Sequence, residues 1–464
     1  MRNKGTFIDE RHPIEVFSTA STIIDEAVEH TLGKDGLNTA IPTQNSYLSI
    51  INDGKTIMES LSSDDKAIQL ALNTLKESAF ATNLNAGDGT TTTAVLQHQL
   101  LKKCYGLPSS LLIKARNKLL EELSNLRKDI KSKEDLNKVV NVALGGNEEL
   151  SQIVMEAFGD DLEQPIRPAL IKGHDMLSKT TQIDGVSLTP VEVNPVVLAN
   201  MPPTLDEEFN VLIINQNVSR LDSGFIEILN RITKSKRKTI LLYTEIMPSV
   251  LDQLLFNIQE GSLHLIPIRL AYQLDKVKDY ISALEYYFDA PVFDDLHPYQ
   301  TFDKESKLEF GKCTGYVINK DSAVIKGAKQ DKTFEILPPK SSIIEVGFVT
   351  YSKQEEDYRR LEDAIHSAYN ALTSGYTIGS GYTLLTLSHS LDTNDEPNYA
   401  LIKEALSYLF NKLSVQSEKK LDEYIEYCME NVFDSYKVTE QVILNAFTVV
   451  SQVLSTRCIL VPYE

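Results

Sequence analysis

The sequence predicts a multidomain protein that is mainly helical at both ends and α/β in the middle. Its 464 residues, 42% of them hydrophobic, are more than one core usually holds, so the chain should form several domains. Apolar residues recur at helical spacing over 13–32, and helical patterns return after residue 355. Between these ends, short apolar runs at 211–214, 239–243 and 264–268 are separated by helical segments, which is typical of βαβ units with a parallel sheet.

The N-terminal part should contain three helices in succession. The first, over 13–32, is ended by glycines. The second runs over 64–83, with Ser62 and Ser63 as candidate caps, and the third begins after residue 89. A short β-type piece over 48–51 leads into a turn. In the C-terminal part, helices are expected over 358–372, 384–391, 400–413 and 440–455.

Charge and cysteine content exclude several classes of function. A net charge of −19 argues against a nucleic acid or an anionic membrane as partner. The four cysteines are far apart with no Cys-x-x-Cys pair, which indicates neither zinc nor disulfides and favours a reducing, cytoplasmic setting. No apolar run approaches the roughly 20 residues that cross a bilayer, and we expect no signal peptide.

The segment Asn85-Ala86-Gly87-Asp88-Gly89-Thr90-Thr91-Thr92-Thr93 is the most informative motif. Glycine permits close approach of the backbone to an anion, and free N–H groups at a helix start favour phosphate. One carboxylate, Asp88, is enough to hold a phosphate-bound Mg²⁺, whose other ligands are usually water and phosphate oxygens. The alternative is a simple turn whose threonines cap the next helix. Four β-branched residues are poor helix formers, however, which suggests that their hydroxyls are used.

This segment resembles the phosphate-binding motif of the chaperonins, ATP-driven protein-folding rings with the usual pattern Ala-Gly-Asp-Gly-Thr-Thr-Thr. It is not a P-loop, because no Gly-x-x-x-x-Gly-Lys occurs. Further segments resemble chaperonin motifs in the same order. These are Thr31-Leu32-Gly33-Lys34-Asp35-Gly36, Ile51-Asn52-Asp53-Gly54, Arg360-Leu361-Glu362-Asp363-Ala364-Ile365-His366, Gly379-Ser380-Gly381 and Phe433-Asp434-Ser435-Tyr436-Lys437-Val438.

The resemblance implies the chaperonin fold with three domains. Residues 1–129 and 375–464 would form a mainly helical equatorial domain that holds ATP. Residues 130–185 and 343–374 would form a small intermediate hinge domain, and 186–342 an α/β apical domain that binds substrate. The intermediate domain would act as a lever that brings Asp363 onto the nucleotide.

The resemblance also implies a role for each motif. Asp88 would bind Mg²⁺, with K⁺ as a further candidate ion, and Asp363, together with Asp53, would orient or deprotonate the attacking water. Taken alone, Asp363 would be a solvated helix carboxylate beside two arginines, whereas His366 is taken as an ordinary helix residue. Asp434 would accept hydrogen bonds from the ribose. The full set of expected ATP-binding residues is Thr31, Leu32, Gly33, Lys34, Asn52, Gly54, Gly87, Asp88, Gly89, Thr90, Thr91, Thr92, Gly379, Ser380, Gly381 and Asp434.

Client binding in the family uses apolar side chains on two apical helices. The candidates here are Ile226, Leu229, Leu251, Leu255 and Phe256. The spacing of the leucines is also that of a stripe that faces a core, so burial is an equal alternative for them. Phe256 falls outside the stripe and is the better candidate, because exposed apolar groups usually have partners.

The sequence therefore predicts an ATP-hydrolysing group I chaperonin that binds and releases non-native client proteins. It would form a homo-oligomeric ring, with seven subunits per ring expected and a co-chaperonin lid as a candidate partner. Compared with the family pattern, Asn52 replaces a lysine, Lys34 a proline and Ser341-Ser342 a glycine pair.

Three alternatives remain. The first is a group II chaperonin, although the short apical region leaves no room for the built-in lid of that group. The others are a non-hydrolysing holdase or scaffold and a small-molecule kinase. The kinase would need a lysine or arginine near the motif to bind phosphate, and the sequence has none within 77–101.

Overall fold

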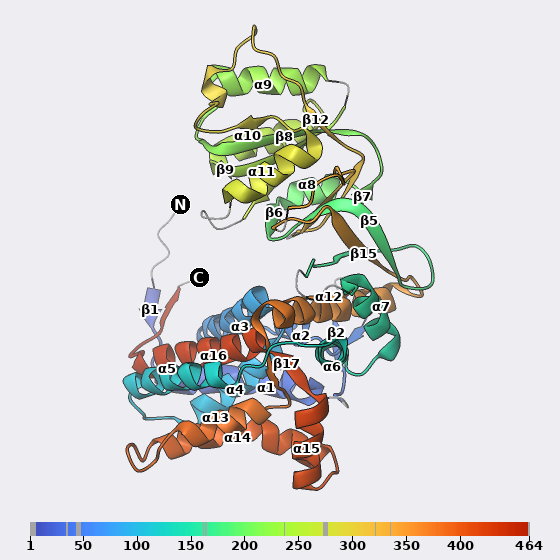
Figure 1. Ribbon diagram of the computed structural model, residues 1–464. Helices are drawn as coiled ribbons and strands as arrows, with labels where there is room; N and C mark the ends of the chain where they lie inside the picture. The colour runs from blue at the N-terminus through green and yellow to red at the C-terminus, as the bar shows by residue number, and fades with distance from the viewer. Residues whose placement is uncertain are drawn as a thin grey trace. The chain divides into compact units, whose positions relative to one another are not determined.

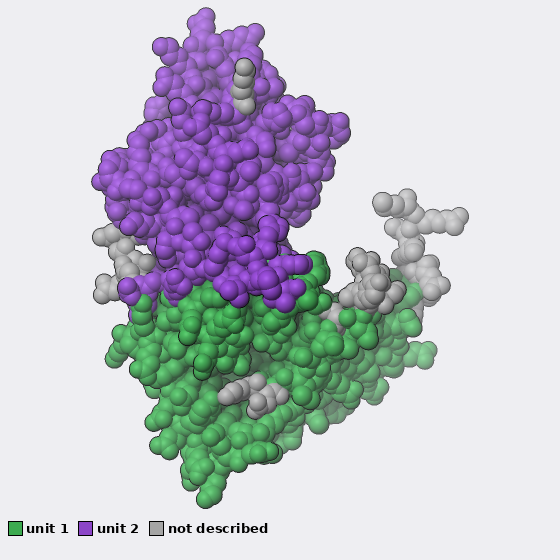
Figure 2. Space-filling view, turned by 90° about the vertical axis from the view of Figure 1, so that its right-hand side faces the viewer, with its two compact units in different colours: residues 1–155, 350–464 green, residues 156–349 purple. Residues whose placement is uncertain are grey.

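The computed structural model describes residues 6–33, 36–42, 48–160, 162, 165–235, 237–271, 277–320, 322–334 and 336–462. The chain divides into two compact units, coloured separately in Figure 2. Unit 1 contains Met1–Met155 and Thr350–Glu464, and unit 2 contains Glu156–Val349. Both chain ends therefore fold into one unit, while the finer division into three domains stays a prediction.

Unit 1 is mainly helical, as predicted (Figure 1). Its helices are α1 (Pro13–Val28), η1 (Glu29–Thr31), α2 (Gly54–Ser60), α3 (Lys66–Ala86), α4 (Thr90–Lys103), α5 (Ser109–Leu126), α6 (Lys133–Ala143), the start of α7 (Glu148–Phe158), α12 (Tyr351–Ser374), α13 (Tyr382–Ser390), α14 (Tyr399–Gln416), α15 (Leu421–Asn431) and α16 (Tyr436–Ser455). Three two-stranded sheets pair β1 (Thr6–Ile8) with β18 (Leu460–Pro462), β2 (Thr39–Pro42) with β3 (Leu48–Ile51), and β16 (Tyr376–Ile378) with β17 (Phe433–Ser435).

The core of unit 1 is centred on α16, which packs against α3, α4 and α5. One stripe of α3 is buried, including Leu72, Leu75 and Ala79, because these residues recur at helical spacing. The caps of α3 differ from the prediction, since Asp65 and not a serine is the N-cap and accepts bonds from the N–H groups of the first turn. The Ser63 hydroxyl instead accepts a bond from the Asp65 N–H at 3.2 Å.

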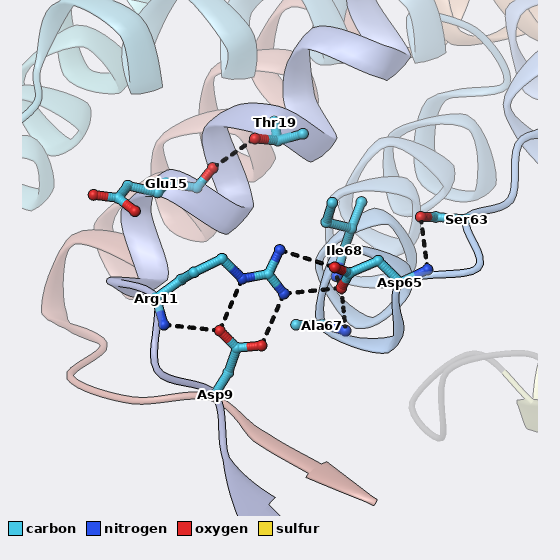
Figure 3. Close-up of polar contacts among 8 residues, drawn as sticks. All are labelled: Asp9, Arg11, Glu15, Thr19, Ser63, Asp65, Ala67 and Ile68. Carbon is cyan, nitrogen blue, oxygen red and sulfur yellow. Dashed lines mark hydrogen bonds and ion pairs between the residues drawn. The ribbon is translucent and has the colours of Figure 1, made fainter.

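Arg11 joins the segment before α1 to the N-terminus of α3. Figure 3 shows its guanidinium between two carboxylates, with Nη2 donating to Asp9 Oδ2 at 2.8 Å and to Asp65 Oδ1 at 2.9 Å. The hydrogen bonds from Arg11 lower the pKa of Asp9 to about 2. The terminal segment that carries β1 is thereby attached to the helical core through an ion pair.

Arg11→Ala is expected to lower thermal stability by less than about 1 kcal/mol, because the side chain is 39% exposed and water screens the pair. The pKa of Asp9 is lower in the folded state, so its contribution is complete above the ordinary value of 3.8 and is lost as pH falls toward 2. Thermal unfolding of the wild type and the variant should therefore differ at pH 7 and converge as the pH falls from 3.8 toward about 2. A difference independent of pH, or an equal loss in the exposed control Arg457→Ala, would contradict this account.

The described residues of unit 2 form two six-stranded sheets. The first has the order β11-β8-β9-β10-β6, with β12 also paired to β8, and the second has the order β4-β15-β5-β14-β13-β7. Their strands are β4 (Ala169–Lys172), β5 (Lys179–Leu188), β6 (Val191–Val193), β7 (Thr204–Leu205), β8 (Phe209–Val218), β9 (Thr239–Ile246), β10 (Leu265–Leu270), β11 (Val292–Phe293), β12 (Gly311–Cys313), β13 (Gly315–Ile318), β14 (Ala323–Lys326) and β15 (Lys340–Val346). The helices are α8 (Pro195–Asn200), α9 (Ser223–Lys234), α10 (Pro248–Gln259), α11 (Val277–Phe288) and η2 (Tyr299–Thr301), with the end of α7.

The parallel βαβ prediction for the middle of the chain is confirmed. Strands β8, β9 and β10 pair in parallel, with α9 and α10 as their connections. Leu212 and Ile214 pack in one apolar cluster with α9, whereas the alternating Val211 and Ile213 pack in another with α11. Both faces of the sheet are thus covered, which explains why its strands are continuously apolar. Among the described residues, no helix is long and apolar enough to cross a membrane.

Candidate nucleotide site

A cavity of about 2100 Å³ lies within unit 1. Its wall comes from η1, the starts of α2 and α4, α6, α12, the turn between β16 and α13, α14, α15 and β17. These elements belong to both halves of unit 1, so the cavity exists only because the two ends of the chain fold together.

The Gly-Asp-Gly segment forms the turn between α3 and α4. Gly87 (φ 76°) and Gly89 (φ 91°) both have left-handed backbone conformations, which favour glycine. Gly89 is the N-cap of α4 and supplies no side-chain cap, so the first N–H groups of α4 have no helical partner. Thr90, Thr91 and Thr92 line the cavity, whereas the Thr93 hydroxyl is buried and donates to the Gly89 carbonyl at 2.9 Å. The start of α4 is therefore suited to an anion.

Helix α12 places Asp363 over this turn. A Cβ atom on Gly87 would lie 2.1 Å from the Cβ of His366, so the turn and α12 can pack this closely only with glycine there. One turn further along, Asn370 Nδ2 donates to the Ala86 carbonyl at 2.8 Å. Asp363 lies three residues before His366 on the same face of the helix, and it lines the cavity. The sequence predicted no special role for His366, but its contact with Gly87 positions α12 against the turn.

The N-terminus of α2 approaches the start of α4 from another side. A Cβ atom on Gly54 would lie 2.0 Å from the Thr91 hydroxyl, which explains glycine at this position. Asp53 is the N-cap of α2 and accepts bonds from the N–H groups of Lys55 and Thr56, both at 3.1 Å. Arg359 Nη1 lies 3.7 Å from Asp53 Oδ2. Both Asp53 oxygens therefore already have partners in the protein.

The carboxylates in the cavity interact strongly with one another. Desolvation, followed by the charges of Asp88 and Asp53, raises the pKa of Asp363 well above its ordinary value. Desolvation and the charge of Asp53 also raise the pKa of Asp88, against the hydrogen bond from the Gly89 N–H. The cavity thus collects negative charge that a bound cation would neutralise.

Asp434 lies on β17, opposite Thr377 of β16. A Cβ atom on Gly379 would lie 2.9 Å from the Asp434 carboxyl carbon, so the glycine keeps space for that carboxylate. Desolvation and the charge of Asp88 raise the pKa of Asp434 to about 7. Asp434 and Asp88 both line the cavity, so one ligand that fills it could contact both groups.

The structure brings together most of the residues predicted from the motifs. The predicted residues that line the cavity are Thr31, Leu32, Gly33, Asn52, Asp53, Gly54, Asp88, Gly89, Thr90, Thr91, Thr92, Asp363, Ser380, Gly381 and Asp434. Gly87 and Gly379 are not among the lining residues and instead allow close packing behind it. Lys34 lies outside the described residues.

Several lining residues were not predicted. Arg359 and Arg360 come from α12, Lys138 from α6, and Tyr427 and Asn431 from α15. Arg360 is the first residue of the predicted Asp363 motif and Arg359 precedes it, and this position was the only signal in the sequence. Nothing in the sequence around Tyr427 distinguishes it from an ordinary helical tyrosine.

The client-binding candidates lie in unit 2 and differ in exposure. Ile226 on α9 is 45% exposed and Phe256 on α10 is 62% exposed. Leu255 is buried in the core, and Leu229 and Leu251 are partly buried against it. For Leu255 the alternative of core burial is correct, because its position on the helix faces the sheet.

The donor set fits a nucleotide with Mg²⁺. The N–H groups without a helical partner and the threonine hydroxyls at the start of α4 suit phosphate oxygens, and one carboxylate, Asp88, is beside them. Among the described residues, no group of three or more His, Cys, Asp or Glu side chains could hold a metal ion alone. An ion bound here would take its remaining ligands from phosphate and water, as Mg²⁺ usually does.

Comparison with known proteins gives the same picture. The model of the TCP-1/cpn60 chaperonin family matches residues 24–254. "Chaperonin GroEL 3" of Acaryochloris marina is 23% identical, over 97% of this chain and 95% of the relative. The chloroplastic chaperonin GroEL of Cyanidioschyzon merolae is 21% identical, over 96% of each chain. The crystal structure of chaperonin gp146 from bacteriophage EL, in the presence of ATP-BeFx, matches 100% of both chains with TM-score 0.76 and 14% identity.

A helical unit built from both chain ends, an α/β unit between them and a phosphate-type site at a Gly-Asp-Gly turn together define a chaperonin. The full coverage of gp146 supports the same fold. The chain belongs to the TCP-1/cpn60 chaperonin family, as a divergent member of the group I type. Its function is therefore that of a protein-folding chaperonin.

Proposed function

We propose that this chaperonin hydrolyses ATP with Mg²⁺ and uses the cycle to bind and release non-native polypeptide. The observation that carries the proposal is the meeting of Asp88 and Asp363 at the open N-terminus of α4. These carboxylates come from distant parts of the chain and both line the cavity. Burial and the charge of Asp88 raise the pKa of Asp363. Phosphoryl transfer to water needs mainly such positioning and charge neutralisation.

Each group in the cavity has a proposed role in hydrolysis. The N–H groups and hydroxyls of residues 90–92 would hold phosphate oxygens, and Asp88 would hold Mg²⁺, which would supply positive charge beside the phosphates. Asp363 orients the water and accepts its proton, since a raised pKa makes it a stronger base. Asp53 is a weaker candidate for that step, because both its oxygens cap α2. Asp434 accepts from the ribose hydroxyls.

The test is steady-state phosphate release by the purified protein with ATP and Mg²⁺, combined with particle mass in the presence and absence of nucleotide. We expect turnover from a particle of many subunits and ATP-dependent refolding of a chemically denatured protein. An assembled particle that binds denatured protein without any turnover would contradict the proposal and make the protein a holdase.

The proposed assembly is a homo-oligomeric ring with seven subunits per ring, working in the cytoplasm. A co-chaperonin lid and K⁺ complete the proposal. The ring, the lid and K⁺ derive from the family resemblance, and the cytoplasmic setting derives from the cysteine content. The mass measurement decides the subunit number, and turnover with K⁺ replaced by Na⁺ decides the role of the second ion.

Phe256→Ser is expected to weaken binding of non-native protein by roughly fivefold, about 1 kcal/mol, because much of an exposed phenyl ring is lost from the contact surface. The measurement is suppression of aggregation of a denatured protein by light scattering. Leu296→Ser is the matched control, since Leu296 is 82% exposed in unit 2 but lies outside α9 and α10. Equal losses in both variants, or a parallel loss of ATP turnover, would count against a specific role for Phe256.

A further inference from the structure

Lysine and arginine side chains reach the wall of the cavity from several elements, and most of them already have partners. Lys138, Arg360 and Lys412 each form an ion pair with a glutamate. The ammonium of Lys419 lies 5.4 Å from the centroid of the Tyr427 ring. These cations are therefore engaged with groups other than the aspartates of the phosphate site.

Arg359 of α12 instead lies against one of those aspartates. Its Nη1 donates to the Thr56 hydroxyl at 2.6 Å and lies 3.7 Å from Asp53 Oδ2. The Thr56 hydroxyl in turn donates to Asp53 Oδ2, so the three side chains form one chain of contacts. Asp53 and Thr56 belong to the N-terminal end of α2 and line the cavity, as Arg359 does. This end of α2 therefore holds the guanidinium at the cavity wall.

The same end of α2 lies beside the expected position of the phosphates. A Cβ atom on Gly54 would lie 2.0 Å from the Thr91 hydroxyl at the start of α4. Besides desolvation, the charge of Asp53 is among the causes that raise the pKa of Asp88 and of Asp363. The guanidinium beside Asp53 is thus close to the groups that would hold the phosphates and the attacking water.

Arg359 also has donors to offer a ligand. Its side chain is 36% exposed and lies one helical turn before Asp363, so both side chains project from one face of α12. Among the described residues, the contacts of Arg359 use Nη1, which leaves Nε and Nη2 as donors. A guanidinium presents its five N–H groups in a planar fork that matches phosphate oxygens. Arg359 can therefore bind a phosphate while it stays in contact with α2.

A cation at this position acts mainly on the terminal phosphate of a nucleotide. That phosphate is the one next to the attacking water, which the proposed mechanism places at Asp363. Hydrolysis spreads negative charge over the oxygens of the transferred phosphoryl group, and a positioned cation stabilises this charge. The carboxylates of Asp53, Asp88 and Asp363, which line the same cavity, would otherwise repel it.

We propose that Arg359 binds the terminal phosphate of ATP, stabilises the charge on it during hydrolysis and lets the site distinguish ATP from ADP. This inference rests on the proposed ATP hydrolysis and adds to it a catalytic cation that also sets specificity for a triphosphate. Asp53 then acts as the group that positions Arg359. This role agrees with its oxygens being bonded within α2, where they are poorly placed to act on water.

The experiment combines steady-state phosphate release with calorimetric binding of ADP and of β,γ-imido-ATP, which is not hydrolysed, each with Mg²⁺, to the full protein. Arg359→Ala should lower turnover on the order of 100-fold, the usual effect of removing one group that stabilises developing charge. Its affinity for β,γ-imido-ATP should fall on the order of tenfold, the effect of one charge-assisted hydrogen bond. Its affinity for ADP, which lacks the terminal phosphate, should stay unchanged.

Two further variants separate the charge from the contact with α2. Arg359→Gln keeps a donor for Thr56 without the charge and should behave like the alanine variant. Arg359→Lys keeps the charge and should recover part of the preference for β,γ-imido-ATP over ADP. Lys353→Ala is the matched control, because it removes a positive charge from an exposed position on α12 that does not line the cavity. It should keep wild-type turnover and affinities.

Equal losses of β,γ-imido-ATP and ADP affinity in the alanine and glutamine variants would overturn the inference, since Arg359 would then only join α12 to α2. Unchanged turnover in both variants would overturn it as well. A wild type without any turnover would contradict the proposed function instead. In that case the ratio of the two affinities would still decide whether Arg359 recognises the terminal phosphate.

Discussion

Asp363→Ala is expected to lower ATP turnover by at least about 100-fold, the contribution of one positioned general base. ATP affinity should stay unchanged or increase. Asp363 shares the cavity with Asp88 and Asp53, and burial together with repulsion from these two carboxylates raises its pKa. Removal of one of these negative charges makes the cavity less unfavourable for a polyanion, so binding should not suffer. The measurements are phosphate release and calorimetric ATP binding on the same preparations.

Two further variants separate chemistry from packing. Asp363→Asn keeps the volume of the side chain on α12 but cannot accept a proton, so it should be as inactive as the alanine variant. Glu362→Ala removes an exposed carboxylate from the neighbouring position and should retain turnover. A large loss of ATP affinity with turnover preserved in Asp363→Ala would show that the residue binds nucleotide and does not act on water.

Much of the fold could be predicted because its elements carry simple periodic patterns. Helix α3 and the parallel strands β8, β9 and β10 were located within a few residues, since each presents one clear apolar stripe or a continuous apolar run. Helix α15 was not predicted. Its buried residues are Tyr424 and Cys428, and charged residues surround them in the sequence. The hydrophobic periodicity is therefore too weak to predict a helix.

The site could be predicted only where a motif carries it. Asp88 and Asp363 were found because their neighbours match a known pattern, and the structure explains one such match: Gly87 must be glycine because His366 packs against it. Tyr427 and Arg359 depend on how α15 and α12 meet the cavity. The contact of these helices with the cavity depends on packing between residues far apart in the sequence, and no local sequence pattern indicates it.

Asp88→Ala is expected to weaken ATP binding in the presence of Mg²⁺ by at least about tenfold. Loss of groups that merely orient a metal ligand already costs 10–100-fold in metal affinity, and Asp88 is the proposed ligand itself. It is also the carboxylate beside the open N-terminus of α4, where the Gly89 N–H donates to it. The decisive quantity is the ratio of ATP affinities with Mg²⁺ and with EDTA, which should be large in the wild type and close to one in the variant.

Glu77→Ala is the matched control, because it removes the same charge from an exposed position on α3, the helix that leads into the turn. It should keep the Mg²⁺ dependence of the wild type. Asp88→Ala should also unfold at nearly the wild-type temperature, since the Asp88 carboxylate accepts a local hydrogen bond from the adjacent Gly89 N–H. If Asp88→Ala retained the full effect of Mg²⁺ on ATP affinity, the ion would have to be held elsewhere. If the effect disappeared together with stability, the carboxylate would act mainly on the fold of the turn.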